Sequence, residues 1–80
     1  MPMDFINGNV SENWRKWKQQ IDLLVNGPLH GKTEKQKCAY ILLYMGEQGR
    51  EIFNTFTFPQ DDQDKVDPLL QKFDDYCKPK

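Results

Sequence analysis

The chain contains four stretches in which apolar residues recur every three or four positions, the spacing of one face of an α-helix. The first stretch places its apolar residues at Trp14, Trp17, Ile21 and Leu24. Either Asn9 or Ser11 supplies the N-cap, because both residue types cap helices well and Asn9 has Glu12 three positions later. Since residues 26–28 form an Asn-Gly-Pro stop signal, we predict a helix over residues 10–26.

The second stretch opens with Thr33 and Gln36, the spacing of a capping box, and continues as an apolar run that ends before Gly46. We therefore predict a helix over residues 34–45. Because this helix is apolar on every side, we expect it to be central and covered by its neighbours. We expect the two tryptophans of the first helix to pack against it.

Two shorter helices are predicted in the second half. The third covers residues 47–56, and Gly49 inside it indicates close packing of another group. After an acidic loop, the fourth covers residues 67–77, with Asp67 as N-cap, Pro68 at the first helical position and Pro79 beyond its end.

These stretches predict one all-α domain over residues 1–80, a small four-helix lobe with a short extended N-terminal segment. No segment alternates between apolar and polar residues with the period of two that marks a half-buried strand. The helical faces predict a core made of Trp14, Trp17, Ile21, Leu24, Leu42, Ile52, Phe53, Leu70 and Phe73.

Several aromatic and apolar residues lie at the edges of the predicted helices. They either close the ends of the bundle or line a partly open groove for a peptide or a second copy. Two tyrosines one helical turn apart could add a wall to that groove. The candidate groove residues are Phe5, Ile6, Tyr40, Tyr44, Phe56 and Phe58.

The composition of the chain restricts the kinds of partner that it is expected to bind. The chain has 80 residues, 38% of them hydrophobic, and a net charge of -1, whereas nucleic-acid binding needs clustered excess Lys and Arg. We therefore expect no direct nucleic-acid binding by this segment. The first half is slightly basic and the second slightly acidic, which suggests either head-to-tail contacts between copies or plain solvated faces.

The sequence shows no recognisable catalytic or metal-binding constellation. His30, the one histidine, has no identifiable nucleophile or carboxylate partner, and the cysteines lack zinc-finger spacing. We predict no enzyme, catalytic residue, metal or cofactor. The longest apolar run, residues 38–45, is too short to span a bilayer, and no signal peptide is recognisable, so we expect no membrane partner and a cytoplasmic protein.

Four motifs in this order resemble the start of the Gag capsid region of gypsy-class LTR retrotransposons, and together they cover nearly the whole chain. They are Phe5-x-x-Gly8-x-Val10-Ser11-Glu12-Asn13-Trp14-x-x-Trp17-Lys18, Lys35-x-Lys37-x-Ala39-x-x-Leu42-Leu43, Gly46-Glu47-x-Gly49-Arg50-Glu51-Ile52-Phe53-Asn54-Thr55-Phe56, and Lys72-Phe73-Asp74-x-Tyr76-Cys77-x-Pro79.

The resemblance implies the N-terminal lobe of an all-helical, two-lobed capsid segment. Its implied role is structural: copies associate into a particle shell inside the cell, weakly or not at all as an isolated lobe. The zinc knuckle with which such proteins bind RNA is absent here. In a domesticated Gag-derived protein the lobe would instead be an adapter that binds short hydrophobic peptides. Residues 5–8 then become the flexible segment expected to meet a partner.

Overall fold

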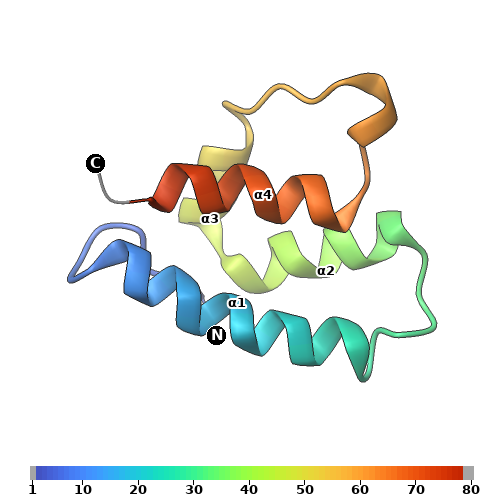
Figure 1. Ribbon diagram of the computed structural model, residues 1–80, viewed down its shortest axis with the longest axis horizontal. Coiled ribbons are helices and arrows are strands. Elements are labelled where there is room, and N and C mark those ends of the chain that lie inside the picture. Colours follow the sequence, from blue (N-terminus) through green and yellow to red (C-terminus); the bar gives the residue numbers. More distant parts are fainter. Residues whose placement is uncertain (1, 79–80) are drawn as a thin grey trace.

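The computed structural model describes residues 2–78 and confirms the predicted all-α class, with no strand in this range. Its elements are α1 (Val10–Asn26), α2 (Glu34–Met45), α3 (Glu47–Phe53), a 3₁₀ turn η1 (Gln60–Asp62) and α4 (Val66–Cys77). In Figure 1, α1 runs opposite to α4 and α2, and α3 lies at the end of α2. The connector, residues 54–65, crosses from α3 to the start of α4.

Phe73 is at the centre of the core. Its ring centroid lies 5.0 Å from that of Phe56, 5.7 Å from Trp14 and 5.9 Å from Phe5, so α4 joins the connector, α1 and the N-terminal segment. Trp14 therefore packs on α4, whereas we had expected it on the second helix. The buried apolar cluster comprises Met3, Phe5, Trp14, Trp17, Ile21, Cys38, Ile41, Met45, Val66, Leu69, Leu70, Phe73 and Cys77.

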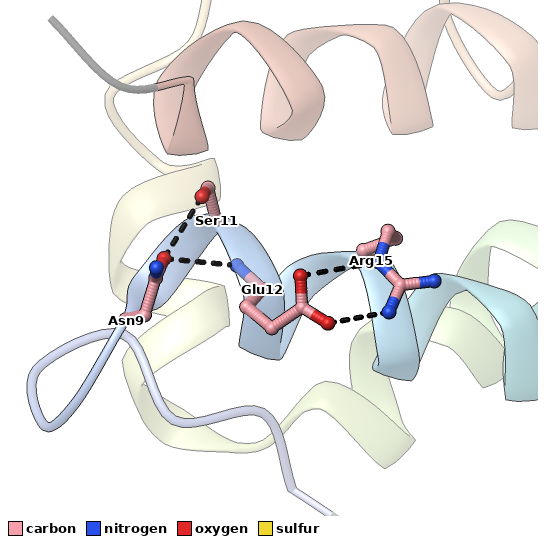
Figure 2. Close-up of polar contacts among 4 residues, drawn as sticks. All are labelled: Asn9, Ser11, Glu12 and Arg15. Atoms are coloured by element: carbon pink, nitrogen blue, oxygen red, sulfur yellow. Dashed lines mark hydrogen bonds and ion pairs between the residues drawn. The ribbon is translucent and has the colours of Figure 1, made fainter.

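The first two helices begin and end where the sequence predicted, because local caps define their starts. Asn9 rather than Ser11 is the N-cap of α1: its Oδ1 accepts hydrogen bonds from the Glu12 backbone N–H and from the Ser11 hydroxyl (Figure 2). Glu12 in turn accepts two hydrogen bonds from Arg15, which lower its pKa. Thr33 and Gln36 form the complete capping box of α2.

The prediction that the second helix is covered on every side is wrong. Cys38, Ile41 and Met45 are buried, but Ala39 and Leu43 on the same helix are exposed. These residues are exposed because the helices that pack against α2, namely α3 and α4, do not surround it. Part of the apolar surface of α2 is consequently exposed.

Two helix boundaries differ from the prediction. α3 ends at Phe53 rather than at residue 56, because the N–H groups of Thr55 and Phe56 bond to carbonyls three residues back and the chain then becomes extended. α4 begins at Val66, with Lys65 and not Asp67 at the N-cap position. Pro68 is tolerated in the first turn because the first four N–H groups of a helix have no intrahelical partner. Pro79 lies outside the described residues.

The N-terminal lead, residues 2–8, is hydrogen-bonded to the helices at Met3 and Phe5, whereas residues 6–8 of the segment predicted to be flexible are exposed. The Met3 N–H donates to the Met45 carbonyl at 3.0 Å, and the Phe5 N–H donates to Gln48 Oε1 at 3.1 Å. Asp4 accepts from the backbone N–H groups of Asn7 and Ile6, and these hydrogen bonds lower its pKa. Phe5 is buried as a result.

Gly46, between α2 and α3, adopts φ 94° and ψ -177°, a conformation that only glycine readily occupies. A Cβ at this position would also lie 3.1 Å from the Cβ of Pro2. We therefore expect Gly46→Ala to lower the free energy of unfolding by about 1–3 kcal/mol, measured by urea denaturation. Gly31→Ala is the matched control, because nothing lies within 4 Å of its Cβ position. Equal stability of the two variants would contradict the strain at Gly46.

Candidate functional site

A concave and largely apolar surface lies between α2 and the connector, and we call it the connector groove. Its volume is about 560 Å³. On the α2 side it is lined by Lys35, Cys38, Ala39 and Leu42, and Phe53 of α3 and Leu69 of α4 also line it. The connector side consists of Phe56, Thr57, Phe58, Asp62, Gln63, Asp64 and Lys65.

The aromatic part of the groove is built by mutual ring packing. The Phe58 centroid lies 5.9 Å from that of Phe53 and 6.2 Å from that of Phe56, the latter pair edge to face. Pro59 follows directly and favours the extended conformation of the residue before it. All three phenylalanines remain half-buried, so part of their apolar surface is available to a ligand.

The α2 side of the groove carries a thiol, that of Cys38, which does not suit nucleophilic chemistry. Burial raises the pKa of Cys38 to about 11, with a further contribution from the negative charges of Glu34 and Asp64. The thiol is therefore protonated near neutral pH, whereas a nucleophilic cysteine needs its thiolate. Cys77, the second free cysteine, is also buried, and burial raises its pKa to about 11 as well. Both thiols act as packing groups.

The six predicted groove residues do not share one surface. Phe56 and Phe58 line the connector groove. Tyr40 and Tyr44 stack on each other on α2, with centroids 6.3 Å apart, and neither lines it. Phe5 is buried against Phe73, and Ile6 is exposed. Both border a separate shallow hollow, together with Tyr76.

The predicted core residues divide into two groups. Trp14, Trp17, Ile21, Leu70 and Phe73 are buried. The other four, Leu24, Leu42, Ile52 and Phe53, are half-buried and pack against that cluster. Leu42 and Phe53 also line the groove, a role that the sequence reasoning missed. The signal for Leu42 was that the second helix is apolar on every side, which we interpreted only as burial.

The described part of the chain contains neither a metal cluster nor a membrane span. No group of three His, Cys, Asp or Glu side chains within residues 2–78 is placed to hold a metal ion. No helix in that range is long and apolar enough to cross a bilayer. Comparisons with protein-family models, curated proteins and solved structures give no match to this chain. The Gag resemblance thus stays a prediction from the residues.

Proposed function

We propose that this chain is a non-enzymatic, cytoplasmic assembly lobe of the retrotransposon Gag capsid type, which self-associates to build a particle shell. The four Gag-like motifs of the sequence and the all-α fold support the proposal. The observation that carries it is the placement of exposed apolar side chains on separate elements. Ile6 and Leu23 are each 71% exposed, Leu43 is 65% exposed and Tyr76 54%.

Separate contact surfaces are what a closed shell requires. Ile6 and Tyr76 lie together at one end of the bundle, Leu23 lies on α1 and Leu43 on α2. Contacts between unlike surfaces generate rings or extended arrays, whereas one self-complementary surface stops at a dimer. Each contact is small and weak, and a high overall affinity arises when many contacts are made at once. The isolated lobe should therefore associate only at high concentration.

Sedimentation velocity over a concentration series tests this function. The wild-type chain should show weak, concentration-dependent association, and the double variant Leu23→Gln with Leu43→Gln should remain monomeric at the same concentrations. Both side chains are exposed, so we expect unfolding free energies within about 0.5 kcal/mol of wild type. Gln20→Ala, on the exposed surface of α1, is the control and should leave association unchanged. Association of the wild-type chain that the double variant leaves unchanged would contradict the proposal.

A second candidate function is favoured by the connector groove itself. In this proposal the lobe is a Gag-derived adapter, and the groove binds a short hydrophobic peptide. Ligand sites are typically concave and mostly apolar with a few polar groups, which describes a groove lined by phenylalanine, leucine and several charged residues. The two functions use different surfaces, because Leu23 and Leu43 do not line the groove.

A further inference from the structure

The lead contacts the rest of the chain as a bound peptide would. Met3 is 3% exposed and Phe5 9%, whereas Pro2 before them and Ile6 after them are exposed. The backbone N–H groups of Met3 and Phe5 also donate to the corner between α2 and α3. We call these two residues the anchors of the lead.

The seat of the anchors is made by residues far along the chain. The Phe5 ring centroid lies 5.9 Å from that of Phe73 and 6.2 Å from that of Tyr76, both on α4. Met45 and Gln48 accept the two backbone hydrogen bonds. None of these contacts depends on the covalent link between the lead and its seat. The lead of a second copy would therefore make the same contacts, which is the basis of domain swapping.

The turn that joins the anchors to α1 is held by hydrogen bonds at the surface. Asp4 accepts from the N–H groups of Ile6 and Asn7 at 2.9 and 3.0 Å. The side chain of Asn13 donates to the Asn7 carbonyl at 2.9 Å. Because residues 6–9 are exposed, water replaces these bonds when the turn opens.

An opened turn brings the anchors within reach of a second copy at the same end of the bundle. The five residues that lead from Phe5 to Val10 span about 17 Å when they are extended. In Figure 1 the turn lies at the end of the bundle where α4 ends. Ile6 and Tyr76 are exposed there and border one hollow, so two copies that pack at this end cover apolar surface.

We propose that two copies of the chain exchange their leads, so that the anchors of each copy occupy the seat of the other. The pair keeps the contacts of the anchors, loses the bonds of the turn and covers Ile6 and Tyr76. The closed turn keeps exchange weak in the isolated lobe, and the high local concentration inside a shell favours it. This inference rests on the assembly function proposed above and specifies how copies join at one of its surfaces.

Removing the Asp4 carboxylate tests the exchange, because its bonds belong to the closed turn and not to the exchanged pair. The background is the double variant Leu23→Gln with Leu43→Gln, which lacks the other proposed contacts. We expect Asp4→Ala to lower the dimer dissociation constant roughly threefold to tenfold in sedimentation velocity, the loss of about one net hydrogen bond per pair. Asp4→Asn is the matched control, because its amide oxygen accepts the same bonds.

Equal association of the alanine and asparagine variants, or no dimer of either up to the solubility limit, would overturn the exchange. Neither result would affect the assembly function, because the background already lacks the leucine contacts on which the test of that function depends.

Photo-crosslinking locates the lead directly. The Asp4→Ala chain with p-azidophenylalanine in place of Phe5 is mixed with an isotope-labelled Asp4→Ala chain, illuminated and analysed by mass spectrometry of the linked peptides. We expect links from residue 5 of the unlabelled copy to Phe73 of the labelled copy, increasing with concentration. Phe73 has no exposed surface, so such a link requires the lead to lie inside the other copy. Links confined to single copies at concentrations where dimers form would overturn the exchange.

Discussion

Replacing Phe73 by alanine is expected to lower the free energy of unfolding by about 3–5 kcal/mol, the usual cost of removing a fully buried aromatic ring. Phe73 has no exposed surface, and its ring packs against those of Phe5, Trp14 and Phe56. Its loss would leave a cavity where α4, α1, the lead and the connector meet. A chain of this length has roughly 4–12 kcal/mol of total stability, so the variant should be largely unfolded at moderate temperature.

Thermal unfolding followed by far-UV circular dichroism measures this effect. Each kcal/mol corresponds to about 4–8 °C in a domain of this size, so the melting temperature should fall by at least about 12 °C. Gln71→Ala, exposed on the same helix, should change stability by less than about 0.5 kcal/mol. A Phe73→Ala variant that melts with the Gln71→Ala control would refute the central position of this ring.

Replacing Trp17 by alanine should have an effect of similar size, about 3–5 kcal/mol. Trp17 is 5% exposed and stacks on Trp14, with ring centroids 5.8 Å apart and 23° between the planes. Trp14 in turn contacts Phe73 and donates from its indole N–H to Asp74 at 3.2 Å. Loss of Trp17 would therefore also loosen the contact between α1 and α4.

Urea denaturation of Trp17→Ala gives the free energy directly by linear extrapolation. Trp17→Phe retains an aromatic ring and should recover part of the lost stability. Gln19→Ala, exposed on the same helix, controls for changes in helix propensity. An unfolding midpoint equal to wild type would mean that Trp17 contributes no packing energy.

The helix starts could be predicted where their signals are local. Asn9 and Thr33 each bond to backbone within three residues, so the sequence alone contains the capping geometry. Pro68 is a weaker signal, because a proline is acceptable at several positions of the first turn and does not define which residue precedes the helix. The end of α3 was missed because Phe56 continues the apolar spacing while its backbone has already left the helix.

Only part of the candidate site could be predicted from the sequence. Phe56 and Phe58 could be identified as edge aromatics beside Pro59. The exposed face of α2 could not be identified in this way, because its exposure depends on how many helices pack around Ala39 and Leu42. The burial of Phe5 could not be predicted for a similar reason: the turn at Asp4 is a local signal, but the bond from Phe5 to Gln48 joins residues 43 positions apart.

The contacts of Phe5 and Trp14 with Phe73 also constrain how the domain is made. A ribosome releases the N-terminal residues first, so the lead and α1 emerge long before α4 exists. Until residue 73 leaves the exit tunnel, both aromatic side chains lack their contact with the Phe73 ring. The core can therefore close only after residue 73 has left the ribosome, and until then the newly made first half exposes apolar side chains that chaperones could bind.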